Sequence, residues 1–178
     1  MGVDKSLLNY HGKPQREWLF DLLQPFCSEI FLSVKKVNQE SAIKLLSDDP
    51  DLGSIGPMAG LIMAIKNSPA KAWMIIGCDY PMVASNTITS LLKARSSEYD
   101  GVGFKNSNTG LIEPLVTIYE PTCFTSLLDF HQSGKQSLSR FIQTVRFHAL
   151  EPHPSWITSI DTTSEAEKVM KTVRYEEG

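Results

Sequence analysis

An aspartate ends one of the most apolar segments of this 178-residue chain. The run Ala72-Trp-Met-Ile-Ile-Gly-Cys78 is followed directly by Asp79, and Pro81 stops the segment. A nearly all-apolar run of this kind suits a central parallel strand that is covered on both faces. Because ligands of open α/β sheets bind outside the carboxyl ends of the strands, we expect Asp79 to project into that crevice. A carboxylate there suits Mg²⁺ held jointly with substrate phosphates, although Asp79 could instead only cap the next turn.

A glycine-proline segment is the second candidate binding site. It reads Gly53-Ser-Ile-Gly56-Pro57-Met-Ala-Gly60. Glycines such as Gly56 and Gly60 let the backbone approach a ligand closely, and the free N–H groups of a helix start can face an anion or the polar edge of a base. Since Gly-Pro is also common at helix starts without a ligand, this segment alone is a weak signal of binding.

Three aspartates come just before that segment, at Asp48, Asp49 and Asp51. Their carboxylates could accept hydrogen bonds from a ribose hydroxyl or from a base. The alternative is an acidic loop that is only solvated.

The opening of the chain carries a lysine beside further turn chemistry. Met1-Gly-Val-Asp-Lys5 is followed by Gly12-Lys-Pro14. The ammonium of Lys5 could pair with a triphosphate as a point charge. Without other context, Lys5 would be an ordinary surface lysine.

The elements that must position these residues alternate between helices and strands. Hydrophobic periodicity and capping residues predict helices over residues 15–26, 38–46, 56–67, 85–95, 121–131, 138–144 and 164–173. Apolar runs predict strands over residues 29–34, 72–78, 100–104, 113–119, 146–150 and 157–160. Such alternation implies βαβ units and a mainly parallel sheet, that is, an α/β fold. We expect one domain over residues 1–178, because no linker or internal repeat divides the chain.

Composition and charge argue against several classes of protein. The net charge of −3 and pI near 5.8 give no sign of a nucleic-acid-binding face. Cys27, Cys78 and Cys123 have no CxxC spacing, which argues against a disulfide framework and a zinc site. No apolar run approaches the roughly 18 residues that span a bilayer, and the first residues lack a signal-peptide pattern. We therefore expect a cytoplasmic protein with neither nucleic acid nor membrane as a partner.

Taken in order, these pieces resemble a known family. The motifs M-G-x-D-K-x-L-L, G-x-P, D…G-P-x-A-G-L, C-D-x-P and E-P-L are similar to those of the molybdenum-cofactor guanylyltransferases. The resemblance is strongest over residues 1–83 and at Glu113-Pro114-Leu115. The sequence G-P-M-A-G favours the guanylyl branch of the wider superfamily over the cytidylyl branch.

The resemblance implies a three-layer Rossmann-like nucleotidyltransferase fold and the transfer of GMP from GTP to molybdopterin, with release of pyrophosphate. It assigns Lys5 to the nucleotide phosphates and Asp79 to Mg²⁺ and nucleotide. Asp49 best matches the acid that helps to bind GTP, with Asp48 as the alternative. Gly56 and Gly60 belong to the nucleotide-binding loop. Molybdoenzymes and other cofactor-biosynthesis proteins are the partner proteins that such a role would bring.

The sequence also departs from the family pattern. The family carries a strand and an L-A-G-G-x-S-x-R loop before M-G-x-D-K, and here the sequence begins inside the motif. The strand would sit in the middle of the sheet, so a chain without it should be less stable. Lys35 stands about where the family often has an asparagine, and N-x-N-T-P-E-D-L is reduced to residues 159–165, with Asp161 as a remaining acceptor.

Several alternatives stay open on sequence alone. The start could have been assigned at an internal methionine, or the protein could be degenerate. The chemistry could use CTP or another phosphate acceptor. A non-catalytic descendant that binds pterin cofactor or a partner protein is a third reading.

Overall fold

The structure is a computed structural model that describes residues 4–35, 41–53, 55–153, 156–160, 165 and 169. Its helices are η1 (Lys5–Leu7), α1 (Gln15–Leu23), η2 (Pro50–Leu52), α2 (Pro57–Asn67), α3 (Ser85–Lys93), η3 (Pro121–Cys123), α4 (Phe124–Gln132) and α5 (Leu138–Ile142), where η marks a 3₁₀-helix. Its strands are β1 (Phe31–Val34), β2 (Lys44–Ser47), β3 (Trp73–Ile76), β4 (Gly101–Lys105), β5 (Ile112–Tyr119) and β6 (Phe147–Leu150). Most of the expected elements are confirmed within a few residues.

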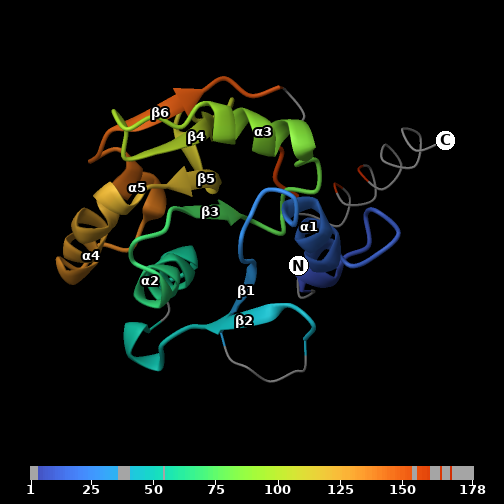
Figure 1. The fold of residues 1–178 in the computed structure, drawn as a ribbon, viewed down its shortest axis with the longest axis horizontal. Coiled ribbons are helices and arrows are strands. Elements are labelled where there is room, and N and C mark those ends of the chain that lie inside the picture. Colours follow the sequence, from blue (N-terminus) through green and yellow to red (C-terminus); the bar gives the residue numbers. More distant parts are fainter. Residues whose placement is uncertain are drawn as a thin grey trace.

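The strands form two sheets (Figure 1). β1 and β2 pair in parallel, and the larger sheet has the order β3-β5-β4-β6. β5 is antiparallel to both of its neighbours while β4 and β6 are parallel, so β3, β4 and β6 all point the same way. The expectation of a mainly parallel sheet is confirmed in strand direction. The placement of β5 between β3 and β4 is an addition that the sequence did not indicate.

Helices cover both faces of the larger sheet, which gives three layers. On one face, α2, α4 and α5 bury residues such as Leu61, Leu127 and Phe141 against Tyr119 of β5. On the other face, α3 and the end of α1 pack against Ile118 and other strand residues. Ile118 and its neighbour Tyr119 serve opposite faces because successive side chains of a strand alternate.

Two sequence-based assignments are wrong. The helix expected over 38–46 gives way to β2, whose Lys44 pairs with Phe31 of β1; Asn38, its expected cap, lies outside the described residues. The pairing with β1 settles this short segment, because its leucines suit a helix and a strand equally well.

The strand expected over 157–160 is absent from the described residues, where the Ile160 N–H makes only a single backbone bond, to the Asp79 carbonyl, at 2.9 Å. Asp161 and most of the helix expected over 164–173 lie outside the described residues.

The surroundings of β3 also differ from the expectation of a parallel central strand. β3 pairs antiparallel with β5, and no other described strand pairs with it. Its other edge faces a cavity of about 580 Å³ that separates it from β1. The lining is mainly apolar and includes Leu32 of β1, Ile75 of β3, Leu19 of α1 and Leu61 of α2. The carboxyl end of β3 therefore borders an open space inside the fold.

Candidate functional site

Asp79 stands at the carboxyl end of β3, where the sequence places it. The Gly77 N–H donates to the Leu115 carbonyl at 2.8 Å and so continues the β3–β5 pairing past the last residue of β3. The Tyr80 N–H then donates to the Gly77 carbonyl at 3.3 Å, which closes a turn around Asp79. A Cβ on Gly77 would collide with the Asp79 carboxylate oxygen Oδ1. Glycine at 77 therefore makes room for the carboxylate.

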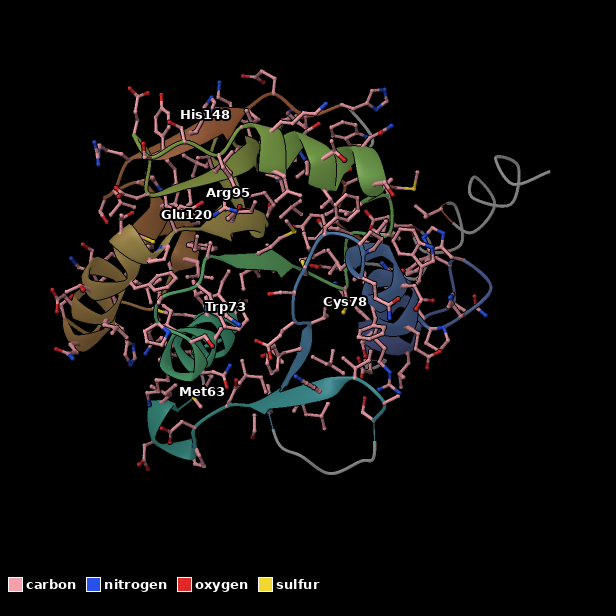
Figure 2. The ribbon with its side chains drawn as sticks, viewed as in Figure 1. Met63, Trp73, Cys78, Arg95, Glu120 and His148 are labelled. Carbon is pink, nitrogen blue, oxygen red and sulfur yellow. The ribbon has the colours of Figure 1, made fainter. Side chains whose placement is uncertain are left out.

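Burial and the negative charge of Asp79 both raise the pKa of two neighbouring groups, Cys78 and Tyr10. Burial raises the pKa of Cys78 to about 11, and the negative charges of Asp79 and Asp4 add to this rise, against the opposing charge of Arg16. Burial also raises the pKa of Tyr10, again with help from Asp79. The end of β3 is thus an acidic position that favours a cation, and Figure 2 marks it with the label of Cys78.

The segment that carries Lys5 lies beside this position. Lys5 begins η1, which Asp4 caps by accepting a hydrogen bond from the Ser6 N–H at 2.9 Å. The loop that follows η1 reaches the turn of Asp79, since His11 Nε2 lies 2.9 Å from the Pro81 carbonyl oxygen. The structure thus brings the two most distant candidate residues, Lys5 and Asp79, to one region.

A second carboxylate reaches the same end of the sheet. β5 runs antiparallel to β3, with Val116 opposite Ile76, so the amino end of β5 with Glu113 lies at the carboxyl end of β3. Glu113 is half-buried, and its Oε2 accepts a hydrogen bond from Asn106 Nδ2 at 3.3 Å. Sequence reasoning assigned no site role to Glu113, and its place in the E-P-L motif was the signal that could have suggested one.

Asp48 and Asp49 follow β2, and their carboxylates differ in their hydrogen-bond partners. Asp49 Oδ1 accepts from the Asp51 N–H at 3.1 Å and Oδ2 pairs with Lys66 Nζ at 3.0 Å. The Lys66 contact is the main reason that the pKa of Asp49 is lowered. Asp48 Oδ1, by contrast, is buried and has no hydrogen-bond partner among the described residues, and this burial raises the pKa of Asp48. Of the two, Asp48 has an acceptor to offer a ligand.

The glycine-proline turn and the end of β3 face one cavity. Gly56 is the N-cap of α2 with a left-handed φ of 61°, a conformation that glycine tolerates best. A Cβ on Gly60 would lie 2.5 Å from the hydroxyl of Ser33 on β1, so Gly60 allows the helix and the strand to approach each other. Pro57 and Gly60 line the cavity together with Gly77. The start of α2 and the end of β3 therefore border one mainly apolar space, although neither Gly56 nor Asp79 is among the residues that line it.

Arg16 adds a cation that sequence reasoning missed. It lines the same cavity from α1, and its nitrogen NH1 is buried without a hydrogen-bond partner among the described residues. Nothing in the sequence separates this arginine from an ordinary helix-surface arginine.

Asp79 and Glu113 offer carboxylate oxygens, the type of ligand that Mg²⁺ takes in proteins. Among the described residues, no group of three or more His, Cys, Asp and Glu side chains gathers as a metal site. Asp79 and Glu113 together supply carboxylate oxygens at one end of the sheet. Mg²⁺ is typically held by one or two carboxylates, with phosphates and water completing its octahedron.

A family model and similar proteins of known name point to the same family. Residues 1–151 match the family described as MobA-like NTP transferase domain. The chain is 28% identical over 154 residues to a molybdenum cofactor biosynthesis bifunctional protein of Synechocystis sp., an alignment that covers 85% of this chain and 44% of that protein. It is 24% identical over 181 residues to a molybdenum cofactor guanylyltransferase of Shewanella halifaxensis, covering 98% of this chain and 89% of that protein.

Solved structures share the fold at low sequence identity. Molybdopterin-guanine dinucleotide biosynthesis protein A from Archaeoglobus fulgidus superposes with a TM-score of 0.79 at 15% identity, over 98% of this chain and 92% of that one. A 2-C-methyl-D-erythritol 4-phosphate cytidylyltransferase from Thermus thermophilus gives 0.74 at 10% identity, over 96% and 94%. No described helix is both long enough and apolar enough to cross a bilayer.

Proposed function

The chain belongs to the MobA-like NTP transferase domain family, and from this premise we propose that it transfers GMP from GTP to molybdopterin and releases pyrophosphate. The names of its guanylyltransferase relatives and the G-P-M-A-G sequence support the guanylyl group. The observation that carries the proposal is the position of Asp79, at the end of β3 and next to the segment of Lys5.

In the proposed reaction, an oxygen of the molybdopterin phosphate attacks the α-phosphorus of GTP. A new P–O bond forms there while the bond from the α-phosphorus to the bridging oxygen breaks, and pyrophosphate leaves with that electron pair. Mg²⁺ held by the carboxylate of Asp79 would neutralise the charge that develops on the phosphate oxygens. The chain mainly positions the two substrates and compensates their charge.

Each candidate residue takes one part of this task. The carboxylate of Asp79 would hold the metal ion, with Glu113 as the second acid at that end of the sheet. Lys5 pairs with the phosphates as a point charge. Asp48 accepts a hydrogen bond from the base or ribose through its unpartnered oxygen, and Gly56 and Gly60 let the backbone approach the nucleotide. Asp49 is engaged with Lys66, which favours Asp48 for this role.

A second candidate is the same chemistry with CTP or another phosphate acceptor. The fold similarity to a cytidylyltransferase is nearly as high as that to the molybdopterin-guanine dinucleotide protein, so the fold does not choose the base. A cytoplasmic location also belongs to the proposal, supported by three cysteines that are all free thiols.

Calorimetric titration with GTP and with CTP, each with Mg²⁺, tests the function. We expect GTP to bind and CTP not to bind, and molybdopterin to cause pyrophosphate release. Asp79→Asn should weaken GTP binding at least about 100-fold, because a charged metal ligand is lost. Asp129→Asn, on the exposed face of α4, is the matched control and should change nothing.

The titration is repeated on a chain that carries an added apolar strand before Met1. Binding of CTP in place of GTP would favour the second candidate. Failure of both forms to bind either nucleotide would favour the non-catalytic, pterin-binding alternative.

A further inference from the structure

Three backbone carbonyls of the turn that carries Asp79 accept hydrogen bonds, two from segments distant in sequence and one from within the turn itself. The Asp79 carbonyl accepts from the Ile160 N–H at 2.9 Å, and the Tyr80 carbonyl accepts from the Val83 N–H at 3.3 Å. The Pro81 carbonyl lies 2.9 Å from His11 Nε2. Since a carbonyl oxygen can only accept, Nε2 must carry the hydrogen and donate it.

The ring of His11 is itself fixed. It stacks on the indole of Trp18 in α1, with ring centroids 3.9 Å apart and planes 12° apart. The loop that carries His11 is closed at its base, where the Gln15 N–H donates to the Leu8 carbonyl at 2.9 Å. The donor at Nε2 is therefore held by packing and does not depend on a flexible side chain.

His11 joins the two segments that carry the candidate site residues. It follows η1, the helix of Lys5, and its bond reaches the turn of Asp79. Its neighbour Tyr10 is 4% exposed and lies within reach of the Asp79 charge. Of these three hydrogen bonds to the turn, only the one from His11 comes from the amino-terminal segment.

We propose that His11 is a positioning residue, which fixes the Asp79–Pro81 turn against the segment of Lys5 and so orients the Asp79 carboxylate for the metal-bound nucleotide. The inference rests on the proposed function for its ligand. Proline lacks an N–H, so its carbonyl is the backbone group by which this end of the turn can be held. A small misplacement of a group that orients phosphates is enough to weaken binding and slow transfer.

Two substitutions separate the hydrogen bond from the packing. His11→Phe keeps an aromatic ring against Trp18 and removes the donor, whereas His11→Gln restores an N–H donor at similar reach. His148 offers a matched control, because its Nδ1 lies 3.1 Å from the Ala94 carbonyl and its ring stacks on Tyr99 at 4.8 Å. Figure 2 shows His148 on β6, away from Cys78, so His148→Phe removes the same kind of bond elsewhere.

The first measurement is hydrogen exchange of the backbone amides of Asp79, Tyr80, Met82, Val83 and Ile160 without nucleotide. We expect exchange about tenfold faster in His11→Phe, the scale of one lost hydrogen bond, and near the wild-type rate in His11→Gln and His148→Phe. Unchanged exchange in His11→Phe overturns the proposal, whatever the ligand of the site is.

The second measurement is calorimetric titration of the same four chains with GTP and Mg²⁺. We expect a Kd about tenfold higher for His11→Phe, rescue by His11→Gln and no effect of His148→Phe. Faster exchange together with an unchanged Kd would make His11 a purely structural residue and overturn the proposal. If the wild-type chain binds no GTP, the proposed function fails and the nucleotide part of this inference fails with it, while the exchange result still decides whether His11 fixes the turn.

Discussion

At the residue scale, Asp48 and Asp49 are neighbouring identical side chains in different environments: Asp49 is paired, whereas Asp48 has a buried oxygen without a partner among the described residues. Asp49 is satisfied by a backbone N–H and by Lys66, so its charge supports the folded state. Asp48 has a buried oxygen without a partner among the described residues, so its charge is costly in the folded state. Groups that are costly for folding and unpartnered are frequent at functional sites.

The opposite pKa shifts of these two acids give a pH prediction. The pKa of Asp48 is raised in the folded state, so its ionisation destabilises the protein once the pH exceeds its ordinary value of 3.8. Asp48→Asn should therefore raise the urea midpoint at pH 7, and the gain should shrink as the pH falls toward that of the unfolded group. The pKa of Asp49 is lowered, so Asp49→Asn should lower the midpoint at pH 7, with the loss fading in acid. Urea melts at pH 7 and pH 4 measure both, and shifts of the same sign would contradict the assignment.

At the scale of elements, the glycines of the sheet give two different predictions. Gly77 follows β3, and a Cβ there would meet the Asp79 carboxylate and the ring of Tyr80. Gly101 starts β4, and a Cβ there would lie 2.5 Å from the backbone carbonyl of Ile118 and would collide with two ring carbons of Phe147. Alanine at the first position disturbs the candidate site, whereas alanine at the second disturbs the packing of two strands.

We expect Gly77→Ala to weaken GTP binding about tenfold or more, because it displaces the carboxylate that holds the metal. Gly101→Ala should instead destabilise the fold by about 1–3 kcal/mol, the usual effect of overpacking a core, and leave the affinity of the folded fraction unchanged. Titration and urea melts of both variants test this pair. Weaker binding in Gly101→Ala with intact binding in Gly77→Ala would contradict the placement of the site.

At the scale of the whole molecule, the cavity between β1 and β3 is a place where the fold is expected to be weak. Each of these strands has one edge without a strand partner among the described residues (Figure 1). Residues of both strands line the same cavity of about 580 Å³. Unpaired strand edges and unfilled apolar space both weaken a fold. An apolar strand is the element that this space suits, because it would supply hydrogen bonds to both edges and fill the cavity.

Adding a short apolar, strand-forming segment before Met1 should therefore raise the urea midpoint. A glycine-serine segment of the same length is the control, because it extends the chain without forming a buried strand. Measured under identical conditions, equal midpoints for the two extended chains would show that the space takes no strand.

The sequence by itself determined the parts of this protein that depend on neighbouring residues. The apolar run that stops at Pro81 located the end of β3 and Asp79, and Gly56-Pro57 located the start of α2. The motifs also predicted the family and the α/β fold. These signals are local, because an apolar run and a proline stop act within a few residues.

Only the tertiary structure decided the parts that depend on partners distant in sequence. Parallel pairing with β1 made Lys44–Ser47 a strand, and the distant pairing of β5 placed Glu113 beside the end of β3. The ion pair with Lys66 distinguishes Asp49 from Asp48. The hydrogen bond to the Pro81 carbonyl is what connects His11 to the turn of Asp79. Strand pairing and burial depend on contacts between segments that are distant in sequence. Local sequence patterns therefore do not predict them.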